Sequence, residues 1–206
     1  MKKILINIVF FIAIVPVGNA QVLAKPELYF GATGGATIAK VGFLPTIHQS
    51  FVLGMNAGGT FRYITEKYFG MQLEVNISQM GWKEDTTSFS KNLTYIELPF
   101  LTHIYFGQKT RIFANLGPQI GFLLRERTDA PVRDYFQQKN PLQRKFDYGF
   151  ALGLGVCVPV RKSVVQLEFR GYYGMNDIYR NRKEDEFQRS NNLQAAISLG
   201  WFFRIK

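Results

Sequence analysis

The sequence predicts an all-β protein built as an eight-stranded antiparallel up-and-down transmembrane β-barrel. Three observations support this fold class. Apolar and polar side chains alternate along eight segments, long and short connections alternate between the segments, and glycines concentrate on the polar face of the strands. Eight such runs in series are typical of a closed sheet. No segment after residue 20 approaches 18 consecutive apolar residues, which excludes a helical membrane protein.

Residues 1–20 are predicted to form a signal peptide, and residues 21–206 a single barrel domain. Lys2 and Lys3 precede an apolar run, and Gly18-Asn19-Ala20 supplies the small residues that signal peptidase requires. The run is shorter than the roughly 20 residues of a membrane helix, so cleavage is preferred to an uncleaved anchor. No cysteine directly follows the expected cleavage site, which argues against a lipoprotein anchor.

Eight strands are expected after the signal peptide, because each run alternates with the period of a strand. Their expected ranges are 28–40, 51–64, 67–82, 93–106, 109–125, 145–160, 163–176 and 192–205. Four long loops are expected at 41–50, 83–92, 126–144 and 177–191, with short turns between them. Membrane barrels have short periplasmic turns and long external loops, so both termini are expected in the periplasm.

One face of the strands is almost purely apolar, and the other carries charge in nearly every strand. In the third strand, Met71, Leu73 and Val75 alternate with Gln72 and Glu74. Periodicity alone does not say which face lies inside, so a soluble, lipocalin-like barrel with an apolar interior is the alternative. The polar face carries the glycines, and small residues suit the crowded interior of a narrow barrel. We therefore expect the apolar face to contact lipid.

An eight-stranded barrel has room inside only for its own side chains. Charges in that space need partners, because burying an unpaired ion is costly. We predict a salt-bridged polar core that plugs the lumen, with a gated ion path as the alternative. The predicted lumen charge network comprises Arg62, Glu74, Glu97, Arg111, Arg125, Asp147, Glu168, Arg170 and Arg204.

The formal net charge of +10 is compatible with acidic partners, and scattered surface charge without a dedicated partner is the alternative. For an exported chain, such partners are anionic lipid head groups and lipopolysaccharide rather than nucleic acid. Candidate lipopolysaccharide-contacting bases lie in the last long loop, where a solvated rim is the alternative: Arg180, Arg182, Lys183 and Arg189. The lone Cys157 excludes an internal disulfide and a cysteine metal cluster. No metal and no cofactor are expected.

No catalytic residues are predicted. Nucleophilic catalysis requires a nucleophile and a base within hydrogen-bond reach, and the chain has only two histidines. His48 falls in the first long loop near Ser50, whereas His103 is expected to face the lumen. No spacing indicates a catalytic pair, so an envelope hydrolase is only the third hypothesis.

Three motifs resemble those of the PorT-like outer-membrane β-barrel proteins of Bacteroidetes, with similar order and spacing. They are Tyr95-Ile96-Glu97-Leu98-Pro99-Phe100-Leu101, then Asn115-Leu116-Gly117-Pro118 with Gly121, then Phe146-Asp147-Tyr148-Gly149 with Gly153-Leu154-Gly155. The resemblance implies an outer-membrane barrel, and the family's namesake is linked to secretion and gliding machinery. The final Phe203-Arg204-Ile205-Lys206 departs from the common ending in phenylalanine, which bears on recognition by the barrel-assembly machinery.

The leading functional hypothesis is a structural or interaction protein with a plugged polar lumen, assisting secretion or envelope assembly. Its expected location is the outer membrane of a Gram-negative bacterium. Expected partners are outer-membrane lipid and lipopolysaccharide, the barrel-assembly machinery during biogenesis, and an envelope protein of unknown identity. A narrow porin-like channel for small solutes is the alternative.

Overall fold

The computed structural model describes residues 22–84, 89–129, 141–161, 163–180 and 187–205, which form an all-β chain. Eight long strands are present, as predicted, together with the two-residue strand β2. The strands are β1 (Val22–Leu44), β2 (Gln49–Ser50), β3 (Val52–Glu66), β4 (Phe69–Glu84), β5 (Ser90–Phe106), β6 (Arg111–Asp129), β7 (Phe146–Val160), β8 (Ser163–Asp177) and β9 (Arg189–Arg204). Within these residues, no helix is long and apolar enough to span a bilayer.

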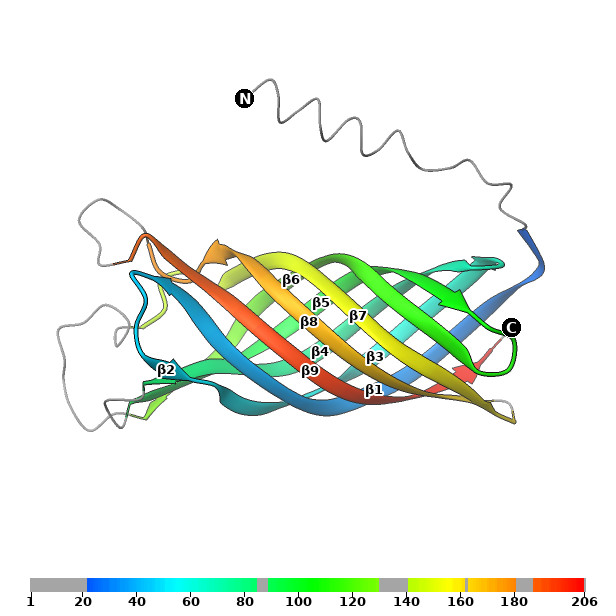
Figure 1. Ribbon diagram of the computed structural model, residues 1–206, viewed down its shortest axis with the longest axis horizontal. Coiled ribbons are helices and arrows are strands. Elements are labelled where there is room, and N and C mark those ends of the chain that lie inside the picture. The colour runs from blue at the N-terminus through cyan, green and yellow to red at the C-terminus, as the bar shows by residue number, and fades with distance from the viewer. Residues whose placement is uncertain (1–21, 85–88, 130–140, 162, 181–186, 206) are drawn as a thin grey trace, which may run out of the picture.

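The sheet closes on itself to form a barrel (Figure 1). Each long strand pairs antiparallel with its neighbours in the sequence, and β1 pairs with β9 from Tyr29↔Arg204 to Leu44↔Arg189. The order around the ring is therefore β1, β9, β8, β7, β6, β5, β4, β3, with β2 extending the β4 edge. This arrangement confirms the predicted eight-stranded up-and-down topology.

The two ends of the barrel differ in their connections. At one end, which we call the terminal end, lie the C-terminus of β9 and the tight turns after β3, β5 and β7 (right in Figure 1). Gly107 is required in the β5–β6 turn, because its φ is +110° and a Cβ there would lie 2.2 Å from the Thr110 carbonyl oxygen. The longer connections lie at the opposite end, which we call the loop end.

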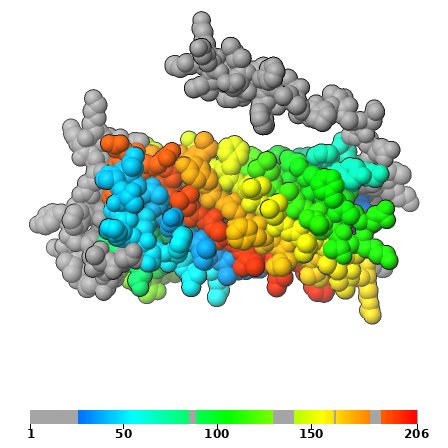
Figure 2. All heavy atoms as spheres, viewed as in Figure 1, coloured from blue at the N-terminus to red at the C-terminus, as the bar shows by residue number. Residues whose placement is uncertain are grey.

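Side-chain exposure divides the strands as predicted, with apolar residues outward and polar residues inward. Leu53 and Leu199 are 79% and 62% exposed, whereas Arg62 is only 3% exposed. The inward glycines have no room for a side chain: a Cβ on Gly35 would lie 1.9 Å from the Ile197 carbonyl oxygen. Figure 2 shows side chains of neighbouring strands abutting along the outer wall. The apolar face therefore lies on the outside of the barrel.

Candidate functional site

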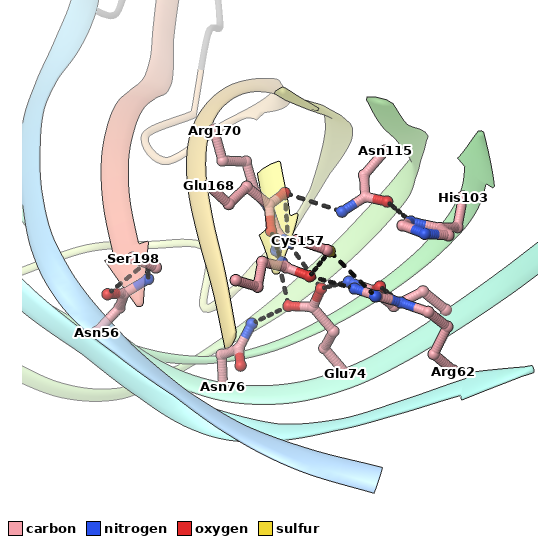
Figure 3. Close-up of polar contacts among 12 residues, drawn as sticks. Asn56, Arg62, Glu74, Asn76, His103, Asn115, Cys157, Glu168, Arg170 and Ser198 are labelled. Carbon is pink, nitrogen blue, oxygen red and sulfur yellow. Dashed lines mark hydrogen bonds and ion pairs between the residues drawn. The ribbon is translucent and has the colours of Figure 1, made fainter. Parts of the chain in front are cut away.

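The centre of the lumen is crossed by an ion pair between facing strands. Three strands separate β4 from β8 in either direction around the ring. Arg170 on β8 nevertheless reaches Glu74 on β4, with Nη1–Oε2 and Nη2–Oε1 distances of 2.7 and 2.6 Å. Arg170 Nη2 also donates to both oxygens of Glu168 at 2.9 Å. This charge-assisted cluster spans the full width of the lumen (Figure 3).

Amide side chains supply the remaining hydrogen bonds of the two carboxylates. Glu74 accepts from Gln72 Nε2 at 2.5 Å and from Asn76 Nδ2 at 2.7 Å. Glu168 accepts from Gln166 Nε2 at 2.9 Å. Both carboxylates are buried, and buried charges are tolerated where each is paired and its lone pairs are satisfied. Three of the predicted network residues thus form one compact ionic cluster.

Arg62 lies one level closer to the terminal end and has no carboxylate partner among the described residues. Its Nε donates to Gln72 Oε1 at 2.6 Å, and its Nη2 donates to Gln166 Oε1. Its Nη1 contacts Cys157 Sγ at 3.8 Å on β7, the strand that faces β3 across the ring. The guanidinium also stacks on Phe202, with its carbon 4.6 Å from the ring centre. Amides and aromatic rings therefore replace the ion pair that we expected for Arg62.

His103 is a buried, hydrogen-bonded residue of the lumen wall. Its Nδ1 lies 2.7 Å from Asn115 Oδ1, and Asn115 Nδ2 donates to Glu168 Oε1 at 3.0 Å. Because that amide oxygen can only accept, the shared proton belongs to His103 Nδ1. His48 is exposed near the loop end, so the two histidines lie in different regions.

Glu97 and Asp147 are buried as predicted but do not join the ionic cluster. Asp147 Oδ2 accepts from Asn192 Nδ2 at 2.8 Å, and that amide also approaches Tyr95 Oη at 3.4 Å from the facing strand. Within the described residues, neither carboxylate lies in an ion pair, and Glu97 Oε1 has no hydrogen-bond partner. The expectation of salt bridges at these two positions is corrected: Asp147 accepts from the Asn192 amide, and no arginine of the described residues lies within ion-pair distance of either carboxylate.

A second ionic group lies at the terminal end. Arg111 Nη1 lies 2.8 Å from Glu27 Oε2, and Arg204 Nη2 lies 3.5 Å from Glu27 Oε1. Tyr29 Oη donates to the same carboxylate at 2.8 Å. Our sequence analysis missed Glu27, which lies one residue before the expected first strand. Glu27 lies two residues before Tyr29 and so has its side chain on the same inward face of the strand, which is the signal that could have identified it.

An apolar plug fills the loop end of the lumen. The buried residues of this plug come from the strands and from the connections after β4, β6 and β8: Ala39, Val41, Phe43, Met80, Trp82, Phe89, Leu93, Tyr95, Leu101, Leu142, Ala151, Tyr172, Ile178, Tyr179 and Phe187. We expected a polar core throughout, so the aromatic plug is a correction. Regular alternation in the strands did not indicate that loop residues fold inward.

Lys91 is buried within this plug. Its Nζ lies 2.8 Å from Glu126 Oε1 and 3.1 Å from Tyr179 Oη, and 5.5 Å from the centre of the Trp82 ring. Burial raises the pKa of Tyr179, so its hydroxyl stays protonated near neutral pH. Lys91 has the same parity as Glu97, and extending the expected strand by two residues would have assigned it to the interior.

Arg125 is exposed, and its predicted place in the lumen is wrong. In the β5–β6 pairing, Tyr95 is opposite Leu123 but Thr94 is opposite Arg125, so a β-bulge inserts one residue. A bulge reverses the parity of the residues beyond it. Arg125 therefore points outward, and its neighbour Glu126 reaches the interior to pair with Lys91.

The four loop bases are only partly described. Arg180 and Arg189 are exposed at the loop end, whereas Arg182 and Lys183 lie outside the described residues, as does the expected signal peptide. The Arg180 backbone nitrogen donates to Gln143 Oε1 at 2.9 Å, which joins two long connections. Among the described residues, no group of three or more histidine, cysteine or acidic side chains is arranged to hold a metal ion.

Comparison with known proteins gives one family and several structural neighbours. Residues 19–180 match the family described as Outer membrane protein beta-barrel domain. No curated protein matches the chain.

Three solved structures are among those to which the chain is similar. Neisserial surface protein A has 15% identity and a TM-score of 0.50, covering 88% of this chain and 99% of that one. OprG from Pseudomonas aeruginosa has 12% identity and a TM-score of 0.49, covering 86% and 95%. Ail of Yersinia pestis has 11% identity and a TM-score of 0.45, covering 86% and 99%. At these identities, the likeness concerns the fold alone.

Proposed function

We propose that this chain, which belongs to the family of outer membrane protein β-barrel domains, is a non-conducting barrel with a structural or interaction role in the cell envelope. Members of this family lie in the outer membrane of Gram-negative bacteria, and so does this chain. The proposed role is exercised through the exterior of the barrel and its loops, because contacts between facing strands and the apolar plug block the lumen.

The observation that carries this proposal is contact across the lumen at four successive levels. Each contact joins strands that face each other across the ring. From the terminal end to the loop end, the pairs are Glu27–Arg111, Arg62–Cys157, Glu74–Arg170 and Tyr95–Asn192. The apolar plug, to which Tyr95 belongs, fills the loop end. A solute would have to break every level in turn, which supports a closed barrel rather than a channel.

The ends of the barrel support an orientation and a class of role. Short turns and termini at one end favour a periplasmic terminal end and an external loop end, as in other membrane barrels. The exposed bases Arg180 and Arg189 would then face lipopolysaccharide. The three PorT-like motifs contribute buried wall residues such as Glu97 and Asp147. Assistance to secretion or envelope assembly is the role that this resemblance suggests.

The purified protein is expected to give no stable channels in planar lipid bilayers, because ion pairs and the plug fill its lumen. The measurement is single-channel conductance over a range of voltages, with a general porin as the positive control. Liposome swelling in small sugars and amino acids tests uncharged and zwitterionic solutes in parallel. Stable, voltage-independent conductance steps that scale with protein concentration would contradict the proposal and favour the narrow channel.

A further inference from the structure

The terminal end of the lumen contains a polar vestibule that none of the roles above uses. This cavity has a volume of about 230 Å³ and is lined by side chains from β1, β3, β5, β6, β7, β8 and β9 and by two turns. Arg62 and His103 belong to its lining, whereas Glu74 and Arg170 do not. The vestibule therefore ends on the terminal side of the central ionic cluster and does not continue through the barrel.

The wall of the vestibule is strongly positive. Five basic side chains line it, and no acidic residue does: Arg62, Lys109, Arg111, Arg161 and Arg204. Arg111 and Arg204 share the carboxylate of Glu27, which is not part of the lining. The described lining therefore carries five positive charges, and the Glu27 carboxylate beside it pairs with two of them. Like charges around a confined space repel one another unless an anion or solvent compensates them.

Arg62 is the buried base of the vestibule and has N–H donors to spare. A guanidinium has five N–H donors, and the contacts to Gln72, Cys157 and Gln166 use three of them. No carboxylate of the described residues pairs with Arg62, although this residue is only 3% exposed. Burying a cation without an anion costs free energy. Arg62 lines the vestibule, so its two remaining N–H donors are available to an anion bound there.

We propose that the vestibule binds one small phosphate-bearing anion, held by Arg62 at its inner end and by Lys109 and Arg161 at its mouth. A phosphate group carries about two negative charges and three strong acceptor oxygens, which matches several converging basic donors. Arginine forks suit such oxygens because they bind them bidentately. The small cavity admits inorganic phosphate or a compact phosphate ester but excludes a nucleotide or a lipid A head group.

Phosphate binding can be measured directly on the folded barrel in a non-ionic detergent. Isothermal titration with sodium phosphate near pH 7, at constant total ionic strength in sodium chloride, is expected to give one saturable site per chain. Glycerol phosphate is expected to compete for that site, and acetate at the same concentration is not. Arg62→Gln is expected to abolish binding, because it removes the buried charge.

Variants at the mouth keep the test valid if Arg62→Gln fails to fold. Lys109 and Arg161 are exposed, and Lys109→Gln and Arg161→Gln are each expected to weaken binding about tenfold without loss of folding. The matched control is Arg127→Gln, which removes an exposed arginine at the loop end and should leave the affinity unchanged. Absence of saturable binding to the native barrel, or equal affinity in the mouth variants, would overturn the proposal.

Discussion

Replacing Arg170 by methionine is expected to lower the free energy of unfolding by about 3–5 kcal/mol. The substitution leaves Glu74 and Glu168 buried near each other without the guanidinium that bridges them. Their amide neighbours still donate, but they carry no compensating charge. Urea-induced unfolding in lipid vesicles, followed by heat-modifiable gel mobility, measures the loss.

Two comparisons separate the charge effect from lost packing. The triple variant Glu74→Gln, Glu168→Gln and Arg170→Met removes both the ions and their repulsion, so it is expected to recover most of the lost stability. Arg127→Met breaks an ion pair whose arginine is 70% exposed, and such pairs contribute about 0–1 kcal/mol. Equal destabilisation by the single and triple variants would show that the central cluster acts through packing alone.

Leu73→Arg is expected to destabilise the barrel by about 2–4 kcal/mol, because it places a charge in the hydrocarbon layer. Leu73 lies outward on β4 between Met71 and Val75, and is 46% exposed within the apolar band. The same unfolding assay in vesicles measures the effect. It should shrink in detergent micelles, where the new guanidinium can reach water more easily.

A charge added away from lipid is the control for this substitution. Gln188→Arg changes an exposed residue just before β9, at the loop end, and should leave the unfolding midpoint unchanged. If Leu73→Arg were as harmless as Gln188→Arg, the outward face of β4 would lie in water, and the membrane orientation would be wrong.

Strand positions and parity were predictable because they depend on local alternation. Alternation placed Met71, Leu73 and Val75 on one face, and the glycines of the opposite face indicated that the apolar face lies outward, as the structure confirms. The buried placement of Arg62, Glu74 and Arg170 follows from the same rule. Parity also identified His103 as a lumen residue.

Partner choice inside the lumen was not predictable, because it depends on the register between distant strands. Arg170 pairs with Glu74 because β4 and β8 face each other, whereas Glu97 forms no ion pair within the described residues. The bulge before Arg125 was not predictable either. One extra residue leaves the local alternation of apolar and polar residues intact, but it exchanges the inward and outward positions beyond it. The inward folding of Tyr179 depends on packing that strand periodicity does not encode.

Tryptophan quenching tests most directly whether the outer face contacts lipid while the lumen is sealed. The chain has two tryptophans: Trp201 is 48% exposed on the outer face of β9, and Trp82 is fully buried in the plug. In vesicles, Trp82→Phe and Trp201→Phe leave one reporter each. We predict that brominated phospholipid quenches Trp201 strongly, and that aqueous iodide does not quench Trp82. Iodide quenching of Trp82, or quenching of Trp201 by iodide but not by brominated lipid, would contradict the account.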